Sequence, residues 1–477
     1  MKKISTFFLF LLTLQIGYTQ APDRSTPPPL GKVKPLQLPV LQRFTLSNGL
    51  SVLLMEKHNV PLVQVNLLIQ TGSFDDPLGK EGITSFAMDL LDEGAGTYDA
   101  LQLADEIEFL GAEIRTMSRS FYSEVNCAAP VSKLDAVLAL MSTIALKPNF
   151  SAAEIERIQK LRLNGLLQNY DDPNTIATRA FNKYMFTEAS PYGRFANENS
   201  IRSYSREELV AFHKLHFTTG NSKLIVVGDV TQGSIQPILE KYFASLGSSA
   251  LIKKTRPTPS QVKGRPIYVV DKPGAAQSVI RIGRLGPERS NVDYYALNAL
   301  NTILGGSFTS RLNNNLREQH GYAYGAGSSF SFWNVPSPFI ASSSVQTDVT
   351  GPALGEFFNE FKKIRMPIPS EEVNRGKSYN ALGYAGDFET NANLADALGD
   401  LFLNQLPDNY FNSYIEKVLV VSKKELESSA KKYILPDNML VVIVGDRSKI
   451  EAGIKKLNLG TINFVLVEDV LGKKPKL

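Results

Sequence analysis

The sequence predicts an α+β fold made of two tandem homologous domains, each a largely antiparallel sheet with helices packed on one face. Hairpins and consecutive strands alternate with pairs of helical patterns along the chain, whereas a doubly wound parallel sheet requires a helix between successive strands. The length of 477 residues and the 43% apolar composition allow two to four domains. An internal repeat indicates that two of them are copies of one plan.

The repeat consists of an apolar run that ends in Gly-Asp and occurs twice. The first copy is Asn221 to Asp229 and the second is Asn438 to Asp446, with the two glycines 445 − 228 = 217 residues apart. A shorter match, Glu154-Ile-Glu-Arg with Glu372-Val-Asn-Arg, has an offset of 372 − 154 = 218. Two matches at nearly the same spacing indicate duplicated units of about 210 residues. Each apolar run is typical of a buried strand.

The elements of the first unit follow from local patterns. Asn48-Gly49 between two alternating segments is typical of a hairpin turn, and Gly111 is a natural stop for the helix before it. In order, we expect a hairpin over 44–54, a strand over 60–70, helices over 80–93 and 99–110, strands over 112–118 and 121–129, and helices over 132–146 and 151–169.

The boundaries of the chain's parts follow from composition. We expect a signal peptide over 1–20, a proline-rich tether over 21–40, an N-terminal domain over 41–248, a linker rich in Lys, Pro, Ser and Gly over 249–264, and a C-terminal domain over 265–477. Two lysines followed by a short apolar run are typical of a leader that is too short to cross a bilayer. No later segment has about 18 consecutive apolar residues. The sequence therefore predicts an exported protein of the periplasm or cell envelope with no transmembrane segment after cleavage, and an uncleaved anchor is the alternative.

Charge and cysteine content exclude several classes of function. The chain has 51 basic and 47 acidic residues, a net charge of +4, and no stripe of Lys and Arg. This balance does not indicate a basic surface that would bind nucleic acid. Cys127 is the only cysteine, so no internal disulfide can form. Its apolar, alternating surroundings favour a buried, inert thiol over a nucleophile.

Several motifs carry a resemblance to a known family. Gly82 to Leu90 resembles the helix that bears H-x-x-E-H in the insulinase/pitrilysin family of zinc peptidases, the inverzincins. The most specific match is Leu304 to Leu312 followed by Leu316 to Tyr324, which is similar to the bacterial processing-peptidase branch. The resemblance covers about residues 41–450. It implies the family's two-domain metallohydrolase fold.

The zinc-binding positions of that family are replaced in this chain. The motif positions hold Ser85, Met88 and Asp89, and the place of the third ligand, a glutamate, holds Asn164 and Gly165. An alcohol, a thioether and an amide are poor substitutes for imidazole and carboxylate ligands of zinc. We therefore expect no zinc or other cofactor in this chain and no peptidase activity by the chain alone.

Two other groups of side chains are candidate metal sites. His213 and His216 are three residues apart on an expected helix, but no neighbouring acidic residues complete a ligand set. We interpret them as one surface and one partly buried histidine. Asp89, Asp92 and Glu93 are candidates for a calcium site. Because calcium needs six or more oxygen ligands, a solvated acidic helix end is the preferred interpretation.

The resemblance implies a second constellation in the C-terminal domain. Active members of the family use an arginine and a tyrosine seven residues apart to bind the substrate carbonyl, and the matching residues are Arg317 and Tyr324. The pattern by itself also fits an arginine at the end of a helix over 308–319 and a core tyrosine in the following strand. Gly305-Gly306 fits either a flexible lip for the substrate or a tight helix entry with Ser307 as N-cap.

The leading hypothesis is a non-catalytic subunit of an exported heteromeric metallopeptidase. In this hypothesis a zinc-bearing insulinase-family subunit forms a heterodimer with the chain, and Arg317 and Tyr324 act on a peptide or unfolded polypeptide in the partner's site. The alternative is a structural, scaffolding or peptide-binding protein of the cell envelope that has kept only the fold. A third possibility is an active enzyme with an unorthodox set of metal ligands.

Overall fold

The computed structural model describes residues 31, 33–187 and 189–476. The expected signal peptide and most of the expected tether therefore lie outside the described residues. Residues 35–477 form one compact unit. Its strands make two six-stranded sheets, one in each half of the chain. The predicted α+β class with two sheets is confirmed.

The N-terminal sheet has the strand order β1-β2-β6-β3-β5-β4. All its neighbours are antiparallel except β2 and β6, which are parallel. The Asn48-Gly49 turn closes the expected hairpin, because Gly49 adopts φ 90° and Thr45 pairs with Ser51. The strands are β1 Leu41–Thr45, β2 Ser51–Glu56, β3 Leu62–Ile69, β4 Glu113–Ser118, β5 Ser123–Pro130 and β6 Ser222–Gly228.

The helices of this half cover one face of that sheet and bury the first hydrophobic core. They are α1 Ile83–Asp89, α2 Ala100–Phe109, α3 Leu134–Leu146, α4 Ala152–Asn169, α5 Pro173–Phe186, α6 Glu198–Arg202, α7 Arg206–His216 and α8 Gln232–Phe243. Of these helices, α5 does not pack on this sheet but on the sheet of the C-terminal half.

The C-terminal sheet repeats the plan of the first, with the order β12-β7-β11-β8-β10-β9. The repeated apolar runs form β6 and β11, which are third in their respective orders, and each has one parallel neighbour, β2 for β6 and β7 for β11. The duplication seen in the sequence is thus a duplication of topology except at one edge, where β1 is antiparallel to β2 but β12 is parallel to β7. The strands are β7 Ile267–Asp271, β8 Gln277–Leu285, β9 Ala323–Phe330, β10 Pro338–Gln346, β11 Leu440–Gly445 and β12 Ile462–Val465.

The helices of the second half are α9 Tyr294–Leu304, α10 Arg311–Asn313, α11 Thr350–Lys363, α12 Ser370–Gly383, α13 Asn391–Leu403, α14 Tyr410–Val420, α15 Lys423–Tyr433, α16 Arg447–Lys456 and α17 Val467–Leu471. Most of them bury a second core against one face of this sheet, whereas α13, α14 and α17 contribute to other apolar clusters. No described helix is long and apolar enough to cross a membrane.

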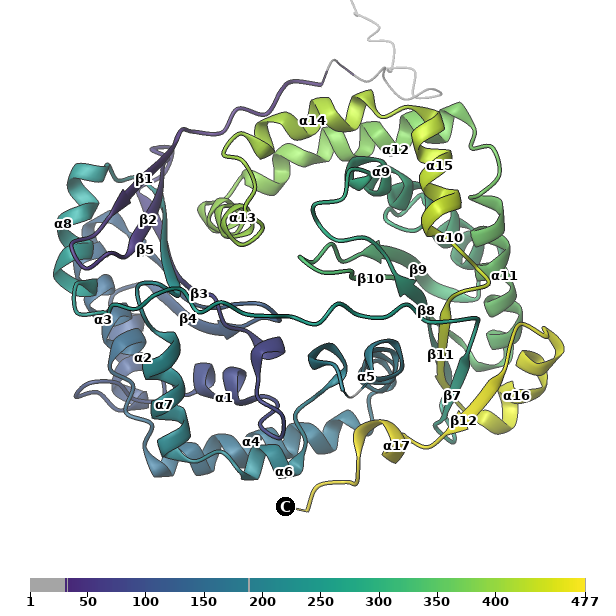
Figure 1. Ribbon diagram of the computed structural model, residues 1–477, viewed down its shortest axis with the longest axis horizontal. Coiled ribbons are helices and arrows are strands. Elements are labelled where there is room, and N and C mark those ends of the chain that lie inside the picture. The colour runs from purple at the N-terminus through teal and green to yellow at the C-terminus, as the bar shows by residue number, and fades with distance from the viewer. Residues whose placement is uncertain (1–30, 32, 188, 477) are drawn as a thin grey trace, which may run out of the picture. The chain divides into compact units, whose positions relative to one another are not determined.

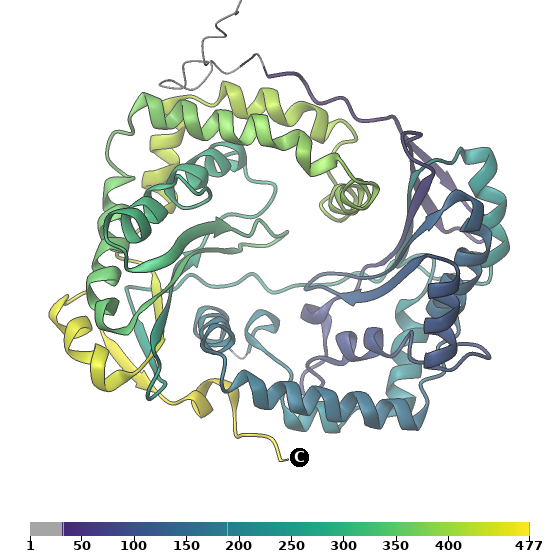
Figure 2. The same cartoon turned by 180° about the vertical axis from the view of Figure 1, so that it is seen from behind.

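Each half contributes one helix to the remaining face of the other half's sheet. Helix α5 packs on β8 and β11, where Phe181 joins a cluster with Val279 and Val442. Helix α13 packs on β3 and β6, where Leu398 joins a cluster with Ile225. Figures 1 and 2 show α13 and α5 on the opposite sides of the two sheets from α8 and α11 respectively. This exchange joins the halves through apolar contacts, which local sequence patterns did not reveal.

Two expected helices differ from the structure. The helix expected over 80–93 spans only Ile83–Asp89, because Gly82 has φ 95° and the Asp76 carboxylate accepts hydrogen bonds from the backbone N–H groups of Gly82 and Thr84. The helix expected over 308–319 begins at Arg311 and continues as a π-helical turn over Asn314–Gln319.

The expected linker over 249–264 contains no helix or strand. It is nevertheless bound to the N-terminal half. Lys254 Nζ lies 2.7 Å from Asp75, and Arg256 lies 3.1 Å from the same carboxylate. The Tyr192 hydroxyl donates to the carbonyl of Pro257 at 2.9 Å. Side-chain contacts, not secondary structure, therefore fix the path of this segment.

Candidate functional site

The positions that match the family's zinc ligands face one another on α1 and α4. On α1 the Ser85 hydroxyl donates to the carbonyl of Gly82 at 3.0 Å, within its own helix. Met88 is buried, with 1% of its surface exposed. On α4 Gly165 lines the cavity beside Ser85, and Asn164 is exposed to solvent. Gly165, which has no side chain, is therefore the residue at the third position.

The carboxylate at this place is already engaged by an arginine. Arg162 of α4 donates through Nε to Asp89 at 2.8 Å, and its Nη2 contacts the same oxygen. Arg157, also on α4, forms an ion pair with Glu93. Burial raises the pKa of Asp89, although the Arg162 guanidinium counteracts that rise. Ion pairs thus link α1 to α4 where the family's metal ligands would meet.

The residues present do not fit a zinc ion. The cavity between Ser85 and Gly165 has a volume of about 270 Å³, and its polar lining includes Arg162 and Arg179. Cationic side chains disfavour a divalent cation. Within the described ranges, no group of three or more His, Cys, Asp or Glu side chains could hold a metal ion.

The histidine pair on α7 does not converge on a common point. Nε2 of His213 lies 2.8 Å from the carbonyl oxygen of Ala145, and Nδ1 of His216 lies 2.9 Å from the Thr71 hydroxyl. Both rings are partly buried, so the expectation of one surface histidine was wrong. Burial lowers the pKa of both, that of His216 to about 4. The pair is therefore neutral and structural at neutral pH.

Asp89, Asp92 and Glu93, at the end of α1 and just after it, do not form the solvated acidic cluster that we expected. Asp89 and Glu93 are in ion pairs, and all three carboxylates of the group are partly buried. Burial raises the pKa of Asp92 to about 6. The single cysteine, Cys127, is fully buried, and burial raises its thiol pKa to about 12. Such a thiol is protonated and inert at neutral pH.

Arg317 and Tyr324, the pair that the family resemblance implied, lie in an open cavity of the C-terminal half. Arg317 is on the π-helical turn and Tyr324 is near the start of β9, the edge strand of its sheet. The guanidinium carbon lies 5.1 Å from the centroid of the Tyr324 ring and 4.7 Å from that of Phe308. Tyr324 is 89% exposed, which excludes the core position left open by the sequence. Arg317 keeps 31% of its side chain exposed.

The glycine turn forms one wall of this cavity and is held by hydrogen bonds. The backbone N–H groups of Gly305 and Gly306 both donate to the carbonyl of Asn301, and Ser328 N donates to Gly305 O at 3.0 Å. A Cβ at Gly305 would lie 2.4 Å from Ser328 N, so the close approach requires glycine there. The Ser307 hydroxyl donates to the carbonyl of Thr302, and Ser310 is the N-cap of the following helix, so the alternative in which Ser307 is the N-cap is wrong.

Sequence reasoning missed other residues of the cavity. Arg281 from β8 and Tyr379 from α12 line it together with Ser342 from β10. The cavity has a volume of about 650 Å³, and none of the described residues that line it is an aspartate or glutamate. Arg281 interrupts an apolar alternation in β8, between Val279 and Gly283. That charged residue on a buried face was the available signal.

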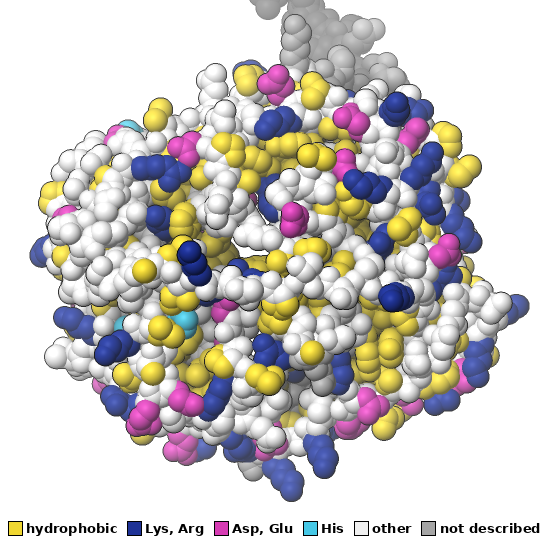
Figure 3. Space-filling view, in the orientation of Figure 1, with side chains coloured by type: hydrophobic (Ala, Val, Ile, Leu, Met, Phe, Trp, Pro, Cys, Tyr) yellow, Lys and Arg dark blue, Asp and Glu magenta, His cyan; other side chains and the backbone are white. Residues whose placement is uncertain are grey.

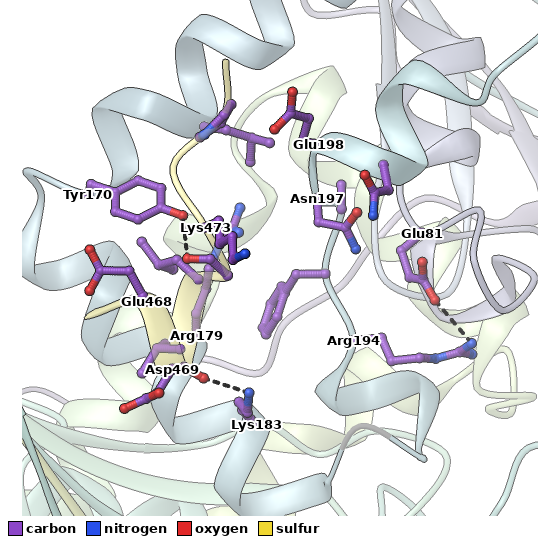
Figure 4. Close-up of a pocket in the computed structure, with 18 of the residues that line it drawn as sticks. Glu81, Tyr170, Arg179, Lys183, Arg194, Asn197, Glu198, Glu468, Asp469 and Lys473 are labelled. Carbon is purple, nitrogen blue, oxygen red and sulfur yellow. Dashed lines mark hydrogen bonds and ion pairs between the residues drawn. The ribbon is translucent and has the colours of Figure 1, made fainter. Parts of the chain in front are cut away.

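A further cavity shares lining residues with the cavity beside Ser85, and one of its walls is the C-terminal segment, residues 468–475. Its volume is about 550 Å³. Figure 4 shows Tyr170 and Lys183 on one side and Glu81 with Arg194 on the other. The Tyr170 hydroxyl donates to the carbonyl of Gly472 at 2.8 Å, and Lys183 donates to that of Asp469 at 2.7 Å. These groups therefore fix the C-terminal segment on the N-terminal half.

The surface agrees with the balanced charge of the sequence. On the face drawn in Figure 3, basic and acidic side chains are interspersed and do not form a continuous basic stripe. This distribution gives that face no electrostatic footprint for nucleic acid.

Comparison with known proteins decides the family. Residues 51–188 match the sequence model of insulinase (peptidase family M16), and residues 203–380 match that of the peptidase M16 inactive domain. The chain belongs to the insulinase family. The match to the inactive domain makes it a non-catalytic-like member of that family.

Several insulinase-family relatives resemble most of the chain. An uncharacterized zinc protease of Rickettsia bellii is 25% identical over 343 residues, which are 70% of this chain and 80% of the relative. The zinc protease PqqE of Helicobacter pylori is 23% identical over 409 residues, 83% of this chain and 90% of the relative.

Solved structures of the family share the fold. A peptidase M16 inactive domain from Pseudomonas fluorescens has a TM-score of 0.79 at 24% identity, covering 85% of this chain and 98% of that one. A protease from Helicobacter pylori has a TM-score of 0.78 at 21% identity, covering 85% of this chain and 100% of the other.

Proposed function

We propose that the chain is the zinc-free subunit of an exported, heteromeric insulinase-family metallopeptidase. One observation carries the proposal: Arg317 and Tyr324 are accessible in an open cavity, in a chain whose own zinc positions hold an ion pair instead of ligands. In this proposal the residues complete the site of a zinc-bearing partner subunit. All the zinc chemistry belongs to that partner, and this chain carries no cofactor.

The geometry suits recognition of a peptide carbonyl. The guanidinium of Arg317 lies against Phe308 and Tyr324, so aromatic faces hold it while it remains accessible. A guanidinium and a phenol that donate to a carbonyl oxygen stabilise the negative charge that develops during hydrolysis. Since Tyr324 is on an edge strand, its hydroxyl can approach a substrate without displacing another strand.

The substrate class follows from the form of the cavity. It is open, it includes glycine backbone at Gly305, Gly325 and Gly327, and it has both aromatic and hydroxyl side chains. Such a surface accommodates an extended polypeptide better than a compact folded protein. We therefore expect peptides or unfolded segments as substrates, in the periplasm or cell envelope.

The test is reconstitution with the zinc-bearing subunit. The full chain is used as bait to isolate a subunit with an intact H-x-x-E-H, and cleavage of an unfolded polypeptide is measured for each subunit and for the pair. We expect activity only from the pair. Arg317→Ala should lower kcat/KM of the pair about 100-fold, the usual cost of removing one oxyanion donor. Normal turnover by the Arg317→Ala pair contradicts the proposed role.

A matched control is available on the same half of the chain. Arg375 is exposed on α12 and does not line the cavity. Arg375→Ala removes the same charge, and we expect the pair to keep full activity. Equal losses in the two variants would indicate a general effect of net charge instead of a local contact.

A peptide-binding or scaffolding protein of the cell envelope is the second candidate. The observation that favours it is that the cavity is formed by this chain alone, from β8, β9, β10 and the glycine turn. The candidate predicts that no zinc-bearing subunit is recovered with the chain and that peptides bound by the chain are not cleaved. Copurification with a large envelope assembly that does not cleave peptides would also favour this candidate.

A further inference from the structure

Arg281 is a partly buried cation with no ionic partner in the part of the chain that the structure describes. Desolvation by burial lowers its pKa, and neither neighbouring carboxylates nor other cations contribute to that shift. Its Nε atom is buried and has no hydrogen-bond partner. A guanidinium held in this way is costly unless an anion binds it.

Other arginines of the same half have partners. Arg284, on the same strand, donates to the carbonyl of Tyr433 at 3.3 Å. Arg289 lies 3.8 Å from Asp400, and Arg311 lies 2.7 Å from Glu372. Arg281 thus differs from Arg289 and Arg311 in having no ion pair, and from Arg284 in donating no hydrogen bond among the described residues.

The position of Arg281 places it in the same cavity as Arg317 and Tyr324. Arg281 pairs with Ser342 of β10, and Ser342 pairs with Gly327 of β9. These three residues form a row across three strands, about 10 Å from end to end at the usual strand spacing. The row meets β9 three residues after Tyr324. A peptide bound at Tyr324 can therefore reach Arg281 within a few residues.

The lining of the cavity selects an anion. Its described lining residues include Arg281 and Arg317 but no carboxylate. Hydroxyl groups of Ser329 and Ser342 are present as additional hydrogen-bonding groups. A planar guanidinium with a nearby hydroxyl is well suited to bind a carboxylate. Peptides carry such groups at the C-terminus and on Asp or Glu side chains.

We propose that Arg281 binds a carboxylate of the peptide that Arg317 and Tyr324 hold. The inference rests on the proposed function, because it assumes that this cavity is a peptide site. It adds a specificity: the C-terminal half prefers peptides with a carboxylate a few residues from the bound carbonyl. The carboxylate is the C-terminal group or an acidic side chain.

The experiment uses fluorescein-labelled octapeptide pools whose variable positions contain only uncharged residues. One pool ends in a free carboxylate, one ends in an amide, and one ends in an amide but contains a single glutamate near the C-terminus. Binding to the full chain is measured by fluorescence anisotropy. We expect the free acid to bind about tenfold more tightly than the plain amide, as a charge-assisted hydrogen bond provides. Affinity of the glutamate pool shows whether a side chain serves as well as the terminus.

Three variants identify the residue responsible. Arg281→Gln should bind the free acid and the amide within about twofold of each other, while its affinity for the amide stays unchanged. Arg375→Gln, outside the cavity, should keep the tenfold preference. Arg281→Lys, which keeps the charge without the planar fork, should retain part of it. Circular dichroism melts test whether each variant is folded. If Arg281→Gln does not fold, the ratio of acid to amide affinity is compared between Arg281→Lys and the unaltered chain.

The outcomes separate this inference from the proposed function. Arg317→Ala should weaken all three pools while the acid preference persists. A preference that persists in Arg281→Gln overturns the inference, and so does equal binding of all pools to the unaltered chain. If Arg317→Ala leaves every affinity unchanged, the proposed function fails even where Arg281 discriminates. If no pool binds, the inference is overturned, whereas the proposed function is still decided by cleavage with the reconstituted pair.

Discussion

Arg162 of α4 donates its Nε to Asp89 of α1 at 2.8 Å, at the place where the insulinase-family motif has its second histidine. The contact joins the same two helices that a shared metal ion would join. A carboxylate occupied by a guanidinium is not free to bind a cation. The ion pair therefore explains how this region stays packed when the metal ligands have been replaced.

The first prediction concerns metal content. We expect the purified full-length chain to contain less than about 0.1 equivalent of zinc after dialysis, because the positions do not provide a closed set of donors. Metal analysis by mass spectrometry measures this directly. One equivalent of zinc, removed by a chelator together with any peptidase activity, would contradict the interpretation of the site.

The second prediction concerns the ion pair. Arg162→Met should lower the free energy of unfolding by only about 0.5–1 kcal/mol, because both side chains are partly exposed and solvent screens the pair. Urea denaturation measures the change. Asp89→Asn in the Arg162→Met background should have a smaller effect than Asp89→Asn alone. Additive effects would show that the two side chains do not interact in solution.

The third prediction separates binding from stability at the tyrosine. Tyr324→Phe in the assembled enzyme should lower kcat about 100-fold, because the ring remains and one oxyanion donor, the phenolic hydroxyl, is lost. The melting temperature should not change, since Tyr324 is exposed. A changed melting temperature with unchanged kcat would assign Tyr324 a structural role.

The fourth prediction concerns pH and Glu124. This residue lies on β5 with 4% of its surface exposed, and burial together with Asp396 of α13 raises its pKa to about 7. Its folded-state pKa exceeds its unfolded value, so its contribution to stability is present at low pH and is lost as pH rises from about 4.5 through 7. A shift of this size corresponds to about 3 kcal/mol.

The measurement for Glu124 is the difference between two pH profiles. The free energy of unfolding is determined by urea denaturation at pH 5 and pH 8 for the unaltered chain and for Glu124→Gln. The variant should lose less stability between these pH values. Other titrating groups, including His216 with its lowered pKa, are present in both proteins and cancel in the difference. Parallel profiles would show that Glu124 does not titrate in this range.

The fifth prediction concerns the helix that α5 provides to the other half. Phe181 is 1% exposed and packs against the C-terminal sheet. Phe181→Ala should cost about 3–5 kcal/mol, as do other large-to-small changes in a core. Leu215→Ala on the exposed face of α7 is the control, with a change below about 0.5 kcal/mol. Equal effects would contradict the packing of α5 on that sheet.

Much of the fold follows from the sequence because its signals are local or repeated. Asn48-Gly49 specifies its hairpin turn by backbone conformation alone. The two Gly-Asp runs identify equivalent strands, β6 and β11, because duplicated units keep the same buried strand. The prediction that Ser85, Met88 and Asp89 do not bind zinc likewise depends only on side-chain chemistry at a fixed spacing. These features required no long-range contact.

The candidate site depended more on tertiary contacts. The sequence pattern left Tyr324 as a possible core residue, because alternation in a strand does not say whether the strand is at the edge of its sheet. The helix entry at Ser307 was misplaced, since its hydroxyl bonds to Thr302, five residues earlier. Arg281 went unnoticed because its importance lies in the absence of a nearby carboxylate in the described structure.

The sequence by itself determined the two-copy α+β plan and the residue types that stand at Ser85, Met88 and Asp89, since both depend on residue types and spacings along the chain. Only the tertiary structure decided that α5 and α13 cross between the halves, that Arg162 binds Asp89, and that Arg281 shares a cavity with Arg317. These relationships join residues from different elements. Their energies come from burial and from charge at short range, which no local pattern records.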